Sequence, residues 1–130
     1  MKFVVDSSVW IDFLNGSVND QTIFLDNKLS NCYILLGDLV KLEVLQGIRE
    51  DDLFRKINGA LNEFILVQMM SPNDSVKYAE MYRFLRKKGI TIRKTTDTII
   101  AGFCILNNLP LLQRDRDFKP FQKYFGLQLL

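Results

Sequence analysis

Short apolar runs alternate with longer stretches of helical periodicity along the whole chain, and this alternation restricts the possible folds more than any other feature. The runs expected to form strands are 2–5, 33–36, 64–67, 109–112 and 127–130. Helical patterns are expected over 9–14, around 23–29, and over 38–48, 53–61, 72–89 and 97–106. Neighbouring parallel strands need crossover helices. The pattern therefore predicts an α/β fold in which helices flank a central, mainly parallel sheet of short strands.

A chain of 130 residues that is 48% hydrophobic is expected to form a single domain, residues 1–130, with its own core. No apolar stretch reaches the roughly 20 residues that span a bilayer, and the first residues do not resemble a signal peptide. These features predict a cytoplasmic protein that does not enter a membrane. Cys32 and Cys104 lack CxxC spacing, so they are expected to be small buried hydrophobic residues.

The chain contains no histidine. This absence excludes Ser-His-Asp and Cys-His nucleophilic catalysis and histidine-rich metal sites. Hydrolytic chemistry would therefore depend on carboxylates, together with a hard cation such as Mg²⁺ or Mn²⁺.

Asp6 ends the first apolar run and precedes Ser7, Ser8 and an expected helix. An aspartate in this position can cap the helix by accepting from its free amides. It can also face a ligand, because ligands of parallel α/β sheets gather at the carboxyl ends of strands. The residues alone leave both interpretations open.

Four further carboxylates are candidates for the same site. Glu43 lies in an apolar helix, where it either marks a narrow solvent-facing stripe or points into a site. Asp97 begins another apolar helix as either a cap or a ligand, and Asp115 and Asp117 follow a strand in a polar loop. Each is ambiguous alone. Together with Asp6, they fall at strand ends and helix starts that this topology brings together.

Such a cluster has an electrostatic cost. Two carboxylates about 4 Å apart repel by roughly 4 kcal/mol at an effective dielectric constant near 20. Three or four of them are tolerated only if they bind protons or a cation. The acidic set therefore predicts a site for Mg²⁺ or Mn²⁺.

Three segments, VVDSSVWIDFL, LEVLQGI and TTDTIIAGFCILNNLPLLQRDRDF, occur in this order along the chain. In these segments and in its size the chain resembles the PIN-domain family, specifically the VapC-type toxin ribonucleases. The resemblance covers essentially the full length and implies a three-layer PIN-like fold. It also implies a Mg²⁺- or Mn²⁺-dependent endoribonuclease that is the toxin of a type II toxin-antitoxin pair. Its substrate would be tRNA, rRNA or mRNA, and it would be homodimeric and restrained by a VapB-like antitoxin.

The resemblance also implies roles for individual residues. The acidic metal-binding and catalytic quartet would be Asp6, Glu43, Asp97 and Asp115. Asp6 and Asp97 would contact the metal directly. Supporting or alternative positions would be Ser7, Thr96 and Asp117, the last as an alternative fourth ligand.

Basic residues are concentrated in positions 83–94 and again in positions 114–123. Such clusters are either solvated faces or surfaces that bind phosphate. By chain neighbourhood, Arg114 and Arg116 are expected to contact the RNA backbone near the site. Candidates farther out are Arg86, Lys87, Arg93 and Lys94.

Other functions fit less well. A phosphatase of the haloacid dehalogenase type needs an acid two residues after its first aspartate, where this chain has Ser8. A receiver domain that accepts phosphate needs an acidic pair after its first strand, an acceptor aspartate at the end of a middle strand and a lysine at the end of a late strand. In this chain only Asp6 is well placed for any of these roles. The remaining alternatives are a housekeeping PIN nuclease that processes RNA, or an inactive module on the same scaffold that binds nucleic acid or protein. The intact acidic set argues against the inactive module.

Overall fold

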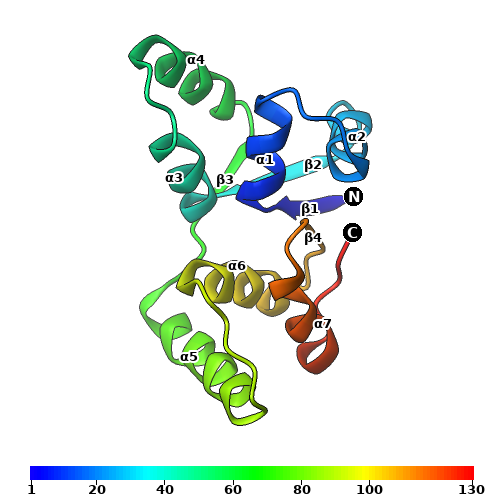
Figure 1. Ribbon diagram of the computed structural model, residues 1–130, viewed down its shortest axis with the longest axis vertical. Helices are drawn as coiled ribbons and strands as arrows, with labels where there is room; N and C mark the ends of the chain where they lie inside the picture. Colours follow the sequence, from blue (N-terminus) through cyan, green and yellow to red (C-terminus); the bar gives the residue numbers. More distant parts are fainter.

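The computed structural model describes all residues 1–130 (Figure 1). The strands are β1 (Lys2–Val5), β2 (Tyr33–Gly37), β3 (Ile65–Val67) and β4 (Leu111–Leu112). The helices are α1 (Ser7–Leu14), α2 (Asp20–Lys28), α3 (Asp38–Gln46), α4 (Asp51–Leu61), α5 (Pro72–Lys87), α6 (Thr95–Leu106) and α7 (Lys119–Phe125), with a short 3-10 helix, η1 (Arg116–Phe118). The six expected helices and the first four expected strands are all present.

The four strands form one parallel sheet in the order β3-β2-β1-β4. The central strand β1 pairs Phe3 with Ile34 of β2 and Val5 with Leu112 of β4. The chain adds β2 and β3 on one side of β1 and then crosses to the other side to form β4. The strand order therefore reverses between β1 and β4. Parallel sheets bind ligands at the carboxyl ends of the strands beside such a reversal.

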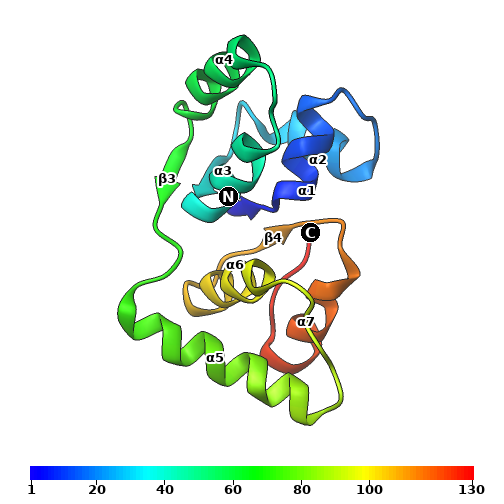
Figure 2. The same cartoon turned by 60° about the vertical axis from the view of Figure 1, so that its left-hand side comes forward.

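Helices cover both faces of the sheet, which confirms the predicted three-layer α/β fold. Figures 1 and 2 show α1 to α4 on one side and α5 to α7 on the other. Because both layers cover β1, its residues Phe3, Val4 and Val5 have no exposed surface. This burial explains why the strand is a continuous apolar run rather than an alternating one.

Helix α6 is held tightly against α5. A Cβ atom on Gly102 would lie 2.3 Å from Cδ1 of Tyr78, so only glycine allows this approach. The Tyr78 hydroxyl donates to the Met69 carbonyl oxygen at 2.6 Å, which fixes the ring. This packing holds α6, whose first turn carries Asp97, against α5.

The C-terminal region differs from the sequence-based prediction. The expected strand 127–130 is reduced to a single parallel bridge between Leu111 and Leu129. The expected strand 109–112 shortens to Leu111–Leu112, because Pro110 has no N–H to donate to a neighbouring strand. Helix α7 was not predicted, although Pro120 in its first turn and Gly126 after its end, at φ +73°, are ordinary helix start and stop signals.

Both cysteines are free thiols. Cys104 is buried as expected, but Cys32 is only half-buried because it lies in the turn before β2. None of the helices combines the length and the apolar character that crossing a bilayer demands.

Candidate functional site

Asp6 lies at the carboxyl end of β1, beside the end of β4. Its backbone N–H donates to the Leu112 carbonyl oxygen at 2.9 Å. Its Oδ2 atom accepts from the Ser8 backbone N at 3.3 Å and from Ser8 Oγ at 2.6 Å, which caps α1. Its Oδ1 atom is buried and has no hydrogen-bond partner. Asp6 is therefore a helix cap that keeps one carboxylate oxygen free.

Asp97 is buried in the first turn of α6 and does not cap it. The cap position is Lys94, no side chain makes a cap hydrogen bond there, and the capping interpretation of Asp97 is wrong. The Asp97 Oδ2 atom is buried without a hydrogen-bond partner. Burial raises the pKa of Asp97 to about 7, helped by the negative charge of Asp6 and opposed by Lys94.

The pKa of Asp6 is also raised, mainly by burial. The hydrogen bonds from Ser8 oppose this shift, because they stabilise the charged form. Asp115 and Glu43 add smaller contributions to the raised pKa of Asp97, so the other three carboxylates all lie within electrostatic reach of Asp97.

Glu43 joins three elements at this site. Its Oε1 atom accepts from Ser7 Oγ at 3.2 Å, and its Oε2 atom accepts from Thr96 Oγ1 at 3.4 Å. Ser7 follows Asp6 at the start of α1, and Thr96 precedes Asp97 in α6. Glu43 is half-buried, so it does not mark a free solvent-facing stripe on α3.

Asp115 and Asp117 both approach Asp97. One carboxylate oxygen from each of the three residues lies within 4.8 Å of the others. Asp115 Oδ1 accepts from the Asp117 backbone N at 2.9 Å. Asp117 Oδ2 accepts from Arg93 Nε at 2.9 Å. These three aspartates form the acidic cluster. Asp117 is shared between this cluster and the Arg93 guanidinium, whereas Asp115 makes no ion pair.

Two of the basic residues expected to contact RNA are engaged in ion pairs. Arg93 pairs with Asp117, and Arg114 pairs with Asp12 of α1, whose carboxylate also accepts from Asn19. The pair between Arg114 and Asp12 links positions 102 residues apart, and no local sequence pattern indicates it.

The other four expected RNA contacts have no carboxylate partner. Lys94 and Arg116 are exposed close to the cluster in the chain. Arg86 and Lys87 are exposed at the end of α5, where the Arg86 guanidinium lies 5.8 Å from the centre of the Tyr82 ring.

The donor set suits a hard divalent cation. All of the converging groups are carboxylates, which are the ligands that Mg²⁺ and Mn²⁺ prefer. Asp6 and Asp97 each present a buried oxygen without a partner, and buried polar atoms in native proteins normally have one. A cation at this position would supply that partner and would favour the ionised form of both acids.

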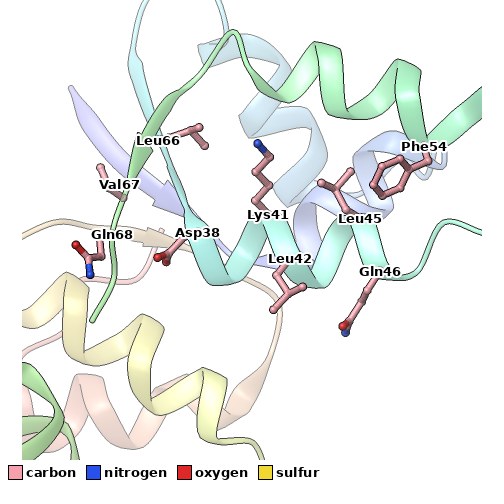
Figure 3. A pocket seen from close by; sticks show the side chains of 9 residues that line it. All are labelled: Asp38, Lys41, Leu42, Leu45, Gln46, Phe54, Leu66, Val67 and Gln68. Atoms are coloured by element: carbon pink, nitrogen blue, oxygen red, sulfur yellow. The ribbon is translucent and has the colours of Figure 1, made fainter. Parts of the chain in front are cut away.

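A concave surface lies between α3, α4 and β3 and contains none of the acidic cluster (Figure 3). Apolar side chains dominate its lining, among them Leu42, Leu45, Phe54 and Leu66. Leu42 is 55% exposed and Leu66 is 49% exposed. Exposed apolar patches of this kind are typical of protein interaction surfaces.

Comparison with known proteins finds relatives that match this chain over nearly its full length. The chain is 23% identical over 127 residues to the ribonuclease VapC11 of Mycobacterium tuberculosis, covering 96% of this chain and 95% of the relative. It superposes on VapBC2 from Rickettsia felis bound to a promoter DNA fragment, with a TM-score of 0.79, 20% identity and coverage of 100% and 98%. It also superposes on VapBC-5 from Mycobacterium tuberculosis, a member of the VapBC family of toxin-antitoxin systems, with a TM-score of 0.68, 15% identity and coverage of 99% and 97%. These structural similarities show that the chain shares the fold of these proteins.

The family comparison covers nearly the whole chain. The family model described as the PIN domain matches residues 3–123, which include Asp6, Glu43, Asp97, Asp115 and Asp117. The chain therefore belongs to the PIN domain family.

Proposed function

We propose that this protein is a Mg²⁺- or Mn²⁺-dependent endoribonuclease and the toxin of a type II toxin-antitoxin pair. The observation that carries the proposal is the pair of buried, unpartnered carboxylate oxygens on Asp6 and Asp97 at the reversal of strand order. Ribonuclease activity in the curated relatives supports the same conclusion.

The proposed roles follow from the contacts of each side chain. Asp6 and Asp97 would hold the cation directly, and Glu43 and Asp115 would complete the site, with Asp117 as the alternative fourth acid. When bound, the cation lowers the pKa of water and stabilises negative charge on the phosphate. The hydroxyls of Ser7 and Thr96 hold Glu43 on both oxygens, which orients its carboxylate to accept a hydrogen bond from the attacking water.

The function is tested with purified protein and defined tRNA, rRNA and mRNA fragments. Cleavage is expected with Mn²⁺ or Mg²⁺ and should stop when EDTA removes the ion. Binding of RNA without cleavage under all conditions would favour the inactive module. Cleavage without growth arrest on expression would favour a housekeeping nuclease.

Two protein partners are part of the proposal. A VapB-like antitoxin is supported by the description of VapBC-5 as part of a toxin-antitoxin system.

A homodimer in the cytoplasm is proposed from the family resemblance. Two exposed leucines labelled in Figure 3, Leu42 of α3 and Leu66 of the edge strand β3, are the candidate contact between the two copies. Sedimentation of a Leu66→Asp variant as a monomer would support this interface, and an unchanged mass would contradict it.

The two hydrogen bonds that the Glu43 carboxylate accepts are expected to affect the rate of RNA cleavage rather than the stability of the fold. The double substitution Ser7→Ala and Thr96→Val removes both hydrogen bonds to the Glu43 carboxylate. Loss of groups that orient metal-site carboxylates typically costs about 10-fold to 100-fold in affinity or activity. We expect a loss of about tenfold in cleavage rate, compared with exposed Ser17→Ala as control. An unchanged rate would mean that Glu43 acts without this support.

A further inference from the structure

Charge is distributed very unevenly between the two halves of the chain. Residues 81–130 contain ten lysines and arginines but only three aspartates and no glutamate, although the whole protein has a net charge of only +2. The three aspartates are Asp97, Asp115 and Asp117, all of which lie in the acidic cluster. These residues form most of the α5 to α7 layer (Figure 2). Outside the cluster, every charged side chain of residues 81–130 is positive.

A groove along η1 and α7 collects part of this charge. Its lining includes Arg116, Lys119 and Lys123, which are exposed, and Asp117. None of the three ion pairs of the protein includes Arg116, Lys119 or Lys123. One carboxylate oxygen of Asp117 lies within 4.8 Å of an oxygen from each of the other two acids of its cluster, so the groove borders the acidic cluster.

The geometry of α7 places these charges in a row. Lys119 and Lys123 are four residues apart, so they lie on the same side of the helix with an axial rise of about 6 Å. Like charges at this spacing disfavour a helix, and α7 has no acidic residue to offset them. The Lys123 ammonium lies 5.2 Å from the centre of the Tyr124 ring, which packs edge-on against Phe84 of α5. The wall of the groove is therefore anchored to the rest of the layer.

We infer that this groove, from Lys123 through Lys119 to Arg116, binds the sugar–phosphate backbone of the RNA strand and leads it to the acidic cluster. The inference rests on the proposed ribonuclease function and identifies where its substrate lies. Proteins that bind single-stranded nucleic acid commonly hold its sugar–phosphate backbone in a positively charged groove. This groove has such charges, without carboxylate partners, and lies next to the proposed hydrolytic site. Arg116 would hold the phosphate nearest the cluster.

The test compares two double variants of the full chain. Lys119→Gln with Lys123→Gln removes two charges from the groove. Lys2→Gln with Lys56→Gln removes two exposed charges from the opposite half of the chain. Fluorescence anisotropy would measure the affinity for a labelled RNA oligonucleotide in EDTA, where the RNA stays intact, over a range of salt concentrations. Circular dichroism would verify that both variants fold.

We expect the groove variant to bind about tenfold more weakly near 0.1 M salt and the control variant to bind like wild type. The slope of log affinity against log salt should fall by about 1.4 in the groove variant, because each contact to a single strand contributes about 0.7. With Mn²⁺ present, the groove variant should need more RNA for half-maximal cleavage but should reach a similar maximal rate.

Equal loss in both double variants would overturn the inference, because the effect would then come from net charge. No loss in the groove variant, or no binding by wild type, would overturn it as well. These outcomes are separate from failure of the proposed function, which would appear as wild-type protein that never cleaves RNA with Mn²⁺.

Discussion

Asp97→Asn is expected to abolish RNA cleavage and growth inhibition while the protein remains folded. The substitution keeps the size of the side chain but removes the charge that would hold a divalent cation in the acidic cluster. We expect the cleavage rate to fall by about a thousandfold or more. The matched control is Asp26→Asn, an exposed aspartate of α2 that is expected to cleave like wild type. Full activity in Asp97→Asn would reject the proposed site.

The same variant should also show that Asp97 has no structural role. Because the pKa of Asp97 is raised to about 7 from its ordinary 3.8, the folded protein holds a proton that the unfolded chain releases between about pH 4 and 7. Without metal, the stability of wild type should therefore fall as the pH rises through this window. Asp97→Asn lacks this loss, so at pH 8 it should melt at least about 4 °C higher, corresponding to about 1 kcal/mol or more.

The difference in melting temperature should vanish only below about pH 3, where Asp97 is neutral in both the folded and the unfolded chain. A variant that melts lower than wild type at every pH would mean that the Asp97 carboxylate stabilises the fold directly. The two readouts, rate and melting temperature, therefore move in opposite directions if the Asp97 charge serves the reaction rather than the fold.

The position of Asp6 could be predicted because it depends on local rules. A continuous apolar run predicts a strand buried on both faces, and alternation with helices predicts a parallel sheet. The end of that strand is then a place where ligands gather. The structure adds that Asp6 caps α1 with one oxygen and keeps the other free, so the capping interpretation is confirmed and the ligand interpretation stays a prediction.

Contacts between distant residues could not be predicted in the same way. Periodicity shows which face of α3 carries Glu43, but it does not show that hydroxyls from α1 and α6 meet it there. The pairing of Arg93 with Asp117 depends on how the loop before α6 meets the turn after β4. Such pairings are set by tertiary packing, which a single sequence does not encode locally.

Helix α7 is a different kind of omission, because its signals were present in the sequence. Its seven residues are too few for an amphipathic pattern to stand out, since two turns give only a few apolar positions. Pro120 and Gly126 mark its ends more clearly than its interior does. The basic groove along α7 was therefore recognisable only once the helix was seen.

A divalent cation should raise the melting temperature of this protein strongly at pH 8 and less at pH 6. Ligands that bind only the folded state stabilise it by RT ln(1 + [L]/Kd), about 2.7 kcal/mol at 100 times Kd, or about 10 °C for a chain of this size. The ion must displace the proton on Asp97. With the pKa of Asp97 at about 7, the ionised fraction is about tenfold lower at pH 6 than at pH 8, and so is the affinity.

At the same Mn²⁺ concentration, the stabilisation at pH 6 should therefore fall to about 1.4 kcal/mol, roughly half of its value at pH 8. Differential scanning calorimetry with and without Mn²⁺ measures both values. Asp6→Asn and Asp97→Asn should each lose most of the rise at pH 8, whereas Asp26→Asn should keep it. A rise that is equal at the two pH values and survives in both site variants would place the ion on other carboxylates. A rise lost in the variants but independent of pH would mean that the cluster binds the ion without releasing a proton from Asp97.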